Sequence, residues 1–356
     1  MTKTNHKSKP AVPVALGIDL AKNTVHVHGV DAEGRTCLTR KMSPTQLKTM
    51  LSNLSPCLVG LEACGRAHWW GREIQALGHE ARLMAPQFVK PFVKSNKNDK
   101  ADAEAICEAV QRPNMRFVGI KSPDQQAQQF IHRSRSRAVG NRTAHVNEVR
   151  GMLAEFGIEI PQGRRHVAPT VAEILGDGGT DKVTLPPRFL GVLAELYEAL
   201  LDMDKRVAHY DAMIDQVAQE DEQAQLLMTV PGVGPMTATA MLSTMGDPGV
   251  FRNGREYAAW LGLVPKQSST GGKERLLGIS KRGDRYLRCL LIHGARSVVS
   301  RHDPTKKTDK RGQWLTGLLE RRHKNVATVA LANRMARTAW AVLTSGEPYQ
   351  KNHVPA

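Results

Sequence analysis

Short apolar runs alternate with helical patterns over the first 110 residues. Residues 14–30 predict two strands joined by a turn: the first is an apolar run that ends at Asp19, and in the second Val25 and Val27 alternate with polar neighbours. Further strands are predicted at 36–42, 57–65 and 79–86, and helices at 44–54, 68–78 and 100–110. This order of elements predicts an α/β domain.

Two long helical patterns with few breakers follow, at 123–157 and 187–225. In the second, Leu193, Leu196 and Leu200 recur at roughly helical spacing. We expect an antiparallel helical hairpin or a coiled coil here, with a loop-rich stretch between the two patterns.

The pattern of predicted elements changes again at Leu226. A helix, a Gly-rich hairpin and a second helix come first, then a small polar loop and a basic helix within 251–300, a charged linker at 305–312 and an Ala-rich helix around 326–343. We therefore predict a disordered arm at 1–12, an α/β domain at 13–120, a helical linker and oligomerisation region at 121–225, and a mainly α C-terminal domain at 226–356.

Composition narrows the class of protein. Of the 356 residues, 41% are hydrophobic, which is enough for a buried core. The sequence contains no apolar run of about 18 residues, so we expect no membrane span. The N-terminal residues lack the apolar core of a secretory signal. Five cysteines occur without a CxxC pair or zinc spacing. These features predict a cytoplasmic protein.

Positive charge gathers in the last third of the chain. Residues 251–356 carry 21 Lys and Arg against 7 Asp and Glu, whereas residues 1–250 carry 29 against 27. Such a field attracts polyanions, and binding releases their condensed counterions. Nucleic acid is the predicted partner, and a basic surface that serves solubility is the alternative.

Four acidic residues stand at the ends of predicted elements. Asp19 and Glu62 end apolar strands, in GIDLAK and VGLEACG, and Asp99 and Asp102 begin a helix in KNDKADA. The i, i+3 spacing of the last two places them on one helix face, and oxygen ligands suit Mg²⁺ or Mn²⁺. Singly, each also has a structural interpretation, as a turn cap for Asp19 or as a complement to the helix dipole for Asp99 and Asp102.

These three motifs together resemble the DEDD transposases of bacterial insertion sequences, a group that includes Piv-like DNA invertases and bridge-RNA-guided recombinases. The resemblance spans about residues 14–346 and implies an RNase H/RuvC-like first domain. Its four acidic positions fall on Asp19, Glu62, Asp99 and Asp102, which would be both catalytic and metal-binding. The neighbours that also fit are Lys22, Gly65, Lys97 and Ala103.

The segment VPGVGPMTATAML opens the C-terminal domain and resembles a helix-hairpin-helix. In that motif the backbone amides of a Gly-rich turn meet a phosphate at a helix N-terminus, here through Gly232 and Gly234. An ordinary Gly turn between packed helices is an equally open interpretation.

A polar loop with a serine follows, in VPKQSSTGGKERLLGISKRGDRYLRC. The resemblance implies that Ser269, four residues after Pro265, is a nucleophile that joins covalently to a DNA 5′ phosphate. The register is open by one residue, so Ser268 and Thr270 are alternatives. From the residues alone, a flexible polar loop is the favoured interpretation of SSTGG.

Basic residues around this loop could neutralise charge that develops at a phosphate. With the two glycines they complete the predicted nucleic-acid-binding set: Gly232, Gly234, Lys273, Arg275, Lys281, Arg282, Arg285 and Arg288. The alternative for the helix that begins near Arg285 is a solvated basic face.

The predicted function is that of a DNA transposase or recombinase that excises and inserts a mobile element by Mg²⁺-dependent cleavage and rejoining through a phosphoserine intermediate. The resemblance further implies donor and target DNA, a structured guide RNA, a homodimer or homotetramer, and a nucleoid-associated bacterial protein. One alternative is a RuvC-like nuclease or junction resolvase that uses metal-activated water. The other is a non-catalytic nucleic-acid-binding protein.

Overall fold

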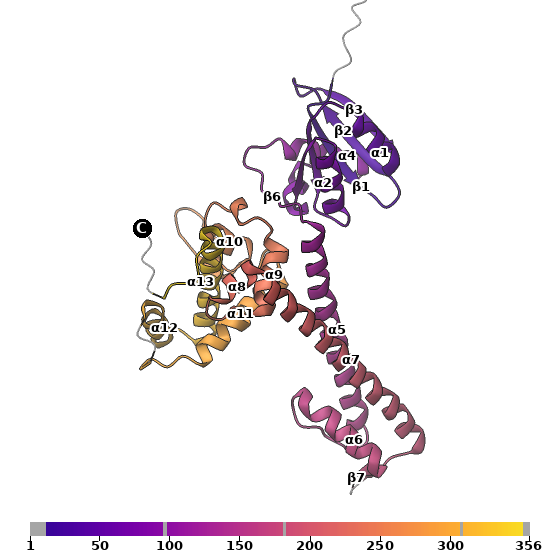
Figure 1. Ribbon diagram of the computed structural model, residues 1–356, viewed down its shortest axis with the longest axis vertical. Coiled ribbons are helices and arrows are strands. Elements are labelled where there is room, and N and C mark those ends of the chain that lie inside the picture. The colour runs from indigo at the N-terminus through magenta and orange to yellow at the C-terminus, as the bar shows by residue number, and fades with distance from the viewer. Residues whose placement is uncertain (1–11, 95–97, 181–182, 307–308, 352–356) are drawn as a thin grey trace, which may run out of the picture. The chain divides into compact units, whose positions relative to one another are not determined.

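A six-stranded mixed sheet forms the centre of the first part of the chain. The computed structural model describes residues 12–94, 98–180, 183–306 and 309–351, and it divides after Ser122 into two compact units (Figure 1). In the first unit the strand order is β3-β2-β1-β4-β5-β6. The strands are β1 (Ala15–Leu20), β2 (Val25–Val30), β3 (Thr36–Met42), β4 (Leu58–Glu62), β5 (Glu80–Met84) and β6 (Phe117–Val118).

The sheet combines two directions of pairing. β1, β2 and β3 pair antiparallel, β4 and β5 run parallel to β1, and β6 is antiparallel to β5. The first five strands were expected from the sequence. β6 was not, because two residues are too few to show a periodicity. A mixed α/β first domain is thus confirmed.

Helices cover both faces of the sheet, namely α1 (Pro44–Ser52), α2 (Ala67–Ala76), α3 (Pro86–Val89) and α4 (Asp99–Val110). The side chains of Ile18 and Leu61 are buried together with those of α1 and α2. On the opposite face, Gly17 and Gly60 lie against α4. Ser43 caps α1: its hydroxyl accepts from the Gln46 backbone amide at 3.2 Å.

The second unit is mostly helical. Its two long helices are α5 (Pro123–Ala154) and α7 (Pro187–Glu220), with α6 (Val167–Asp177), β7 (Gly179–Thr180) and β8 (Val183–Thr184) between them. Arg135 pairs with Asp211, Arg142 with Asp204 at 2.8 Å, and the His145 ring with the Leu196 carbonyl at 2.7 Å. Because the partners descend as the first numbers rise, α5 and α7 run antiparallel, which confirms the predicted helical hairpin.

The rest of this unit is a helical bundle with one small hairpin. Its elements are α8 (Glu222–Met228), α9 (Pro235–Met245), α10 (Gly254–Trp260), β9 (Pro265–Gln267), β10 (Leu276–Ile279), α11 (Arg285–Ser300), α12 (Lys310–Arg321) and α13 (Lys324–Ser345). Tyr257, Leu287 and Leu331 lie in its core.

Two details of this bundle differ from expectation. The supposed charged linker at 305–312 includes the first turn of α12, because the side chain of Asp309 accepts from the Gly312 amide at 2.7 Å and caps the helix. The supposed polar loop contains the β9–β10 hairpin. Among the helices of the described residues, none has the length and apolar character that a membrane crossing requires.

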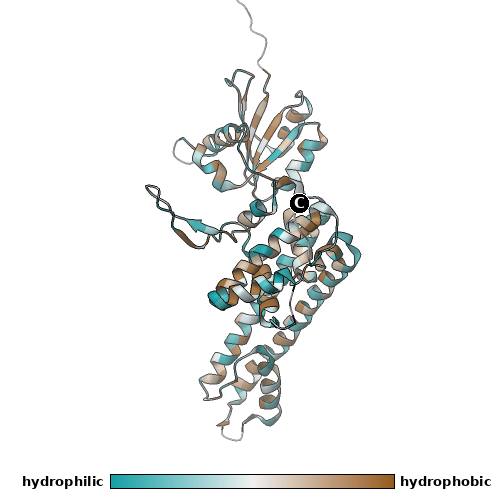
Figure 2. Cartoon of the chain, turned by 90° about the vertical axis from the view of Figure 1, so that its left-hand side faces the viewer, coloured by the Kyte–Doolittle hydropathy of each residue, from teal (hydrophilic) through white to brown (hydrophobic). Residues whose placement is uncertain are grey.

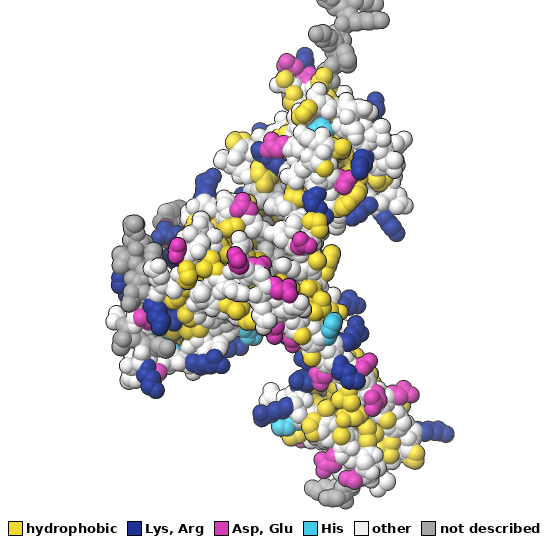
Figure 3. Space-filling view, viewed as in Figure 1, with side chains coloured by type: hydrophobic (Ala, Val, Ile, Leu, Met, Phe, Trp, Pro, Cys, Tyr) yellow, Lys and Arg dark blue, Asp and Glu magenta, His cyan; other side chains and the backbone are white. Residues whose placement is uncertain are grey.

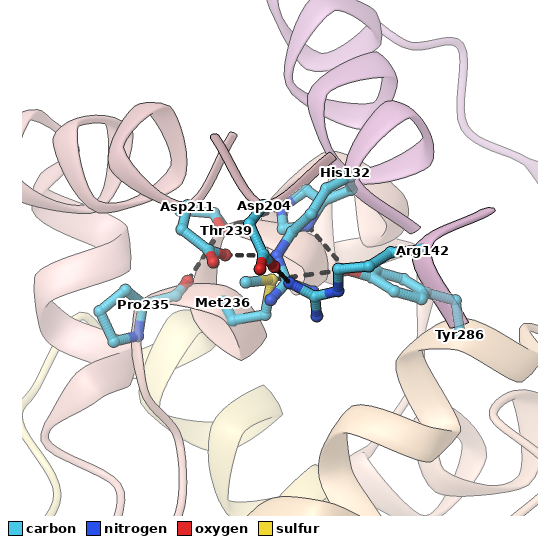
Figure 4. A network of polar contacts seen from close by, with 9 residues as sticks. His132, Arg142, Asp204, Asp211, Pro235, Met236, Thr239 and Tyr286 are labelled. Carbon is cyan, nitrogen blue, oxygen red and sulfur yellow. Dashed lines mark hydrogen bonds and ion pairs between the residues drawn. The ribbon is translucent and has the colours of Figure 1, made fainter. Parts of the chain in front are cut away.

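A buried polar network joins α5 to α9 and α11 (Figure 4). The hydroxyl of Thr239 donates to the Pro235 carbonyl at 2.8 Å, so it accepts from Nε2 of His132 at 2.9 Å. His132 Nδ1 then accepts from the Tyr286 hydroxyl at 3.1 Å. Burial, with a smaller effect of Arg135, lowers the pKa of His132 to about 4, so the ring is neutral at physiological pH. The Tyr286 hydroxyl also lies 3.4 Å from the Met236 sulfur, a second acceptor for its proton.

Candidate functional site

Three carboxylates from two elements meet at the end of β1. One oxygen each of Asp19, Asp99 and Asp102 lies within 4.8 Å of the others. Asp19 is the last residue but one of the apolar strand β1, and Asp99 and Asp102 lie in the first turn of α4. The structure therefore brings together three of the four acidic residues predicted from the sequence.

Glycine makes this meeting possible. A Cβ atom at Gly17 would lie 2.2 Å from the Ala103 carbonyl oxygen, and one at Gly60 would lie 2.7 Å from Val110. Without these side chains, α4 lies directly on β1 and β4. Its N-terminus is fixed by Asn98, whose side chain accepts from the Ala101 amide at 2.8 Å. The first turn of α4 is thus held beside the end of β1.

The three charges repel one another in a half-buried setting. Burial raises the pKa of Asp19 above its ordinary value, and the nearby charges of Asp102 and Asp99 raise it further. His26 counteracts part of this shift. A cation placed among the oxygens would relieve both the repulsion and the lost solvation, and hard oxygen ligands are those that Mg²⁺ and Mn²⁺ prefer.

Glu62 lies close by on the neighbouring strand, outside the compact group of three. Ile18 of β1 pairs with Leu61 of β4, so Asp19 and Glu62 are the next residues along two parallel neighbours. Glu62 is half-buried at the end of β4. Its position on the same sheet edge is compatible with a fourth ligand, and the assignment stays a prediction.

Two residues beside the carboxylates did not stand out in the sequence. His26 pairs with Asp19 across β1 and β2, and its Nδ1 atom lies 3.5 Å from an Asp99 oxygen. The pKa of the Cys64 thiol is raised by burial and then by the charges of Glu62 and Asp19. Counting back through the predicted β1–β2 turn would have placed His26 opposite Asp19; Cys64 gave no such signal.

The neighbours that fit the family pattern have separate local roles. Lys22 is exposed, and its carbonyl accepts from Arg66 at 2.9 Å. Gly65 lies in the turn after β4, and Ala103 is buried against Gly17. Lys97, like most of the arm predicted at 1–12, lies outside the described residues.

Ser269 lies near the tip of the β9–β10 hairpin, which projects from the helices of its unit (Figure 2). Thr270 and Lys273 bridge across Gly271 and Gly272, whose φ values of 57° and 78° fit a two-residue hairpin turn that favours glycine. Ser269 is exposed, and its hydroxyl oxygen accepts a hydrogen bond from the side-chain amide of Gln267 at 2.9 Å. The supposed flexible loop is thus an ordered hairpin that presents the serine.

The predicted basic residues divide into two groups. The first consists of exposed side chains on the hairpin, in the turn before α11 and at the start of α11, namely Lys273, Arg275, Lys281, Arg282 and Arg285. The second is Arg288 alone, which is 7% exposed and donates to the carbonyls of Leu261 and Arg282 at 3.0 and 3.3 Å. Its guanidinium holds the segment before α11 in place, so we exclude Arg288 from the DNA-contacting surface.

The Gly-rich turn before α9 is packed on the bundle. Gly232 has φ +96°, and a Cβ atom there would meet Met335 at 2.7 Å and the Gly294 carbonyl oxygen at 3.1 Å. This contact explains Gly232 by packing of the turn against α11 and α13. Gly234 is exposed directly before the N-terminus of α9. A phosphate contact by either glycine stays a prediction.

Known proteins match the chain along nearly its whole length. A family model described as the transposase IS116/IS110/IS902 family matches residues 224–311, and a transposase model of the DEDD type matches residues 16–158. A probable family 20 transposase of Pseudomonas aeruginosa is 50% identical over 94% of this chain and 98% of its own. The chain belongs to the IS116/IS110/IS902 family of transposases.

Further relatives of this chain are also described as transposases. The transposase for insertion sequence element IS1328 of Yersinia enterocolitica is 41% identical over 94% of this chain and 98% of its own. The transposase for IS1111A of Coxiella burnetii is 43% identical over 94% and 91%. The predicted family and the predicted class of enzyme, a DNA transposase, are thereby confirmed.

Replacement of Arg288 by Met separates its structural role from DNA contact. Loss of the guanidinium leaves two carbonyls without their donors, so the free energy of unfolding should fall by about 1–3 kcal/mol in chemical denaturation. Arg285→Met, at an exposed position on the same helix, should change it by less than about 0.5 kcal/mol while weakening DNA binding. A fully stable Arg288→Met transposase with weakened DNA binding would contradict this assignment.

Replacement of Asp19 by Asn tests the repulsion among the carboxylates. Because the pKa of folded Asp19 is raised above its ordinary value of 3.8, folded protein holds this proton more tightly, and stability falls as pH rises from there through the folded pKa. Without divalent metal at pH 7, Asp19→Asn should therefore unfold at a higher temperature than the parent, and at acid pH the gain should vanish.

Added Mg²⁺ should reverse the order of these two proteins, since it stabilises the parent and not the variant. Glu80→Gln is a matched control: it removes one negative charge from the same unit, in a surface ion pair with Arg82, and should raise stability under neither condition. Equal responses of Asp19→Asn and Glu80→Gln would show that the three carboxylates do not share a cation site.

Proposed function

We propose that this transposase cleaves and rejoins DNA through the cluster of three carboxylates in its first unit and through Ser269 in its second unit. The observation that carries the proposal is the meeting of Asp19, Asp99 and Asp102 at the end of the central strand. The strand order, with an antiparallel β1–β2–β3 meander beside parallel β4 and β5, supports an RNase H/RuvC-like domain. Glu62 at the neighbouring strand end would complete the DEDD set.

The donor set fits a divalent metal ion, Mg²⁺ or Mn²⁺. Asp19, Asp99 and Asp102 would hold it, with Glu62 beside them. When bound, such an ion supplies positive charge at a phosphodiester and lowers the pKa of the attacking group. The protein contributes rigid placement, since α4 is fixed on the sheet by its contact with Gly17.

Ser269 would carry the strand between cleavage and rejoining. Its Oγ atom forms a bond to the 5′ phosphorus, the bond from phosphorus to O3′ breaks, and the serine proton ends on the released 3′ hydroxyl. Rejoining reverses these steps with a new 3′ hydroxyl. Gln267 donates to Oγ and orients it, and the exposed Lys273 and Arg275 on the same hairpin balance the phosphate charge.

Assembly and RNA guidance complete the proposal. The long helical hairpin of α5 and α7 would pair subunits as a dimer or tetramer. Carboxylates of one subunit would then serve the serine of another. The excess of Lys and Arg after residue 251 supports binding of a structured guide RNA as well as DNA.

A covalent adduct tests this function. The transposase would be incubated with its flanking RNA, Mg²⁺ and labelled donor and target DNA, and adducts would be scored on denaturing gels. The parent should form an adduct, and Ser269→Ala and Asp102→Asn should reduce it below detection because they remove the nucleophile and a metal ligand. Ser268→Ala and Thr270→Ala, on the same hairpin, should retain it.

Two results would contradict the proposal. Loss of the adduct in Ser268→Ala or Thr270→Ala, with Ser269→Ala unaffected, would move the nucleophile. Mg²⁺-dependent cleavage that yields no adduct and is unaffected by Ser269→Ala would favour the nuclease that uses metal-activated water.

A further inference from the structure

A long depression follows α13 in the C-terminal bundle, and nothing in the proposed chemistry uses it. One part, of about 780 Å³, lies between the β9–β10 hairpin, α12 and α13. The other, of about 730 Å³, lies between α10, α13 and residues 347–351. Arg334 and Arg337 line both parts, so the two adjoin at these residues. We call the whole the α13 cleft.

Cations surround the α13 cleft. Among its described lining residues a single carboxylate, that of Glu347, stands against six cations: Arg255, Lys310, Arg311, Arg334, Arg337 and Lys351. Lys and Arg side chains also stand over the part of the bundle around α12 on the face shown in Figure 3. This imbalance attracts an anion with charges spread along its length.

The walls of the cleft are apolar and partly aromatic. Leu277 and Val326 line the part beside the hairpin and are 42% and 53% exposed. Trp314 lies in the same part, with the guanidinium of Arg334 4.9 Å from its ring centroid. In the other part the Arg311 guanidinium lies 5.8 Å from the ring centroid of Tyr349. Exposed apolar surface of this kind is stabilised when it is covered.

The α13 cleft combines cationic side chains with flat apolar surface, and this combination favours one class of ligand. In a duplex the faces of the bases are stacked and unavailable, whereas a single strand offers phosphates to the arginines and free base faces to Trp314 and the apolar wall. An apolar peptide would leave the six cations without counter-charge. The chemistry of the cleft therefore favours an unpaired nucleic-acid strand.

The position of the cleft indicates which strand. Pro265, Leu277 and Ile279, on the two strands of the hairpin that presents Ser269, form one wall. We propose that the α13 cleft binds single-stranded DNA, namely the unpaired strand that adjoins the 5′ phosphate attacked by Ser269. This inference rests on the proposed function for the identity of the strand, but the binding itself requires no reaction.

The test is equilibrium binding by the full-length chain with Ser269→Ala, in EDTA, so that neither cleavage nor metal contributes. The probe is a fluorescein-labelled 12-nucleotide oligo-dT, followed by fluorescence anisotropy. Arg334→Gln with Arg337→Gln should weaken binding about tenfold or more and reduce the slope of log affinity against log salt by about 1.4, or about 0.7 for each lost phosphate contact.

A matched control removes the same charge elsewhere. Arg188 and Arg206 are exposed on α7, and their double replacement by Gln should leave the affinity within twofold. Trp314→Leu should weaken oligo-dT binding about 5- to 150-fold, in the range of one stacked base, and should leave binding of an abasic 12-mer unchanged. Circular dichroism would confirm that each variant is folded.

Several outcomes would overturn the inference. These are equal losses in the two arginine pairs, equal losses of oligo-dT and abasic binding in Trp314→Leu, tighter binding of oligo-U than of oligo-dT, or tighter binding of a 12-base-pair duplex. A change of oligomeric state in Trp314→Leu, seen by sedimentation, would instead assign the cleft to a second copy of the chain.

Failure here is distinguishable from failure of the proposed function. If the variant with Arg334→Gln and Arg337→Gln binds oligo-dT with the parent's affinity while the adduct still requires Ser269, the cleft assignment is wrong and the serine chemistry stands. If the cleft binds the strand as described while Ser269→Ala still forms adducts, the serine chemistry falls alone.

Discussion

The contact between the backbone of α4 and Gly17 of β1 is the constraint on which the carboxylate site depends. Any side chain at position 17 would occupy the space of the Ala103 carbonyl, 2.2 Å from where its Cβ would stand. Close packing of this kind cannot be adjusted without moving the helix. It places Asp99 and Asp102 beside Asp19, where burial and mutual repulsion raise the pKa of Asp19. The packing thus holds three carboxylates where they repel one another, and a bound cation would offset this repulsion.

The sequence indicated this site because its signals are local. An acid at the end of an apolar strand is costly unless it has a partner, and Asp19 and Glu62 both stand at such ends. The spacing of Asp99 and Asp102 follows from one turn of helix. That Glu62 lies outside the compact group of three depends on side-chain placement in the folded protein, and no local pattern in the sequence encodes this.

The C-terminal unit was less predictable because its roles depend on tertiary contacts. Arg288 looked like its exposed neighbour Arg285, yet the helix turns it inward onto the carbonyls of Leu261 and Arg282. Gly232 suggested a phosphate-binding turn from its sequence, and the packing of its carbonyl against Gly294 could not be seen there. His132 gave no signal at all, since its partners Thr239 and Tyr286 lie more than 100 residues away. The segment around Ser269 was expected to be a loop, because Gly271 and Gly272 interrupt any strand pattern between the paired residues on either side of them.

The most direct test of the account is to locate the cation itself. Crystals of the transposase would be soaked in Mn²⁺ and the anomalous scattering mapped for the parent and for Asp19→Asn. We predict a peak among the oxygens of Asp19, Asp99 and Asp102 that disappears in the variant. A parent map at millimolar Mn²⁺ with no peak there, or a peak that persists in Asp19→Asn, would contradict it.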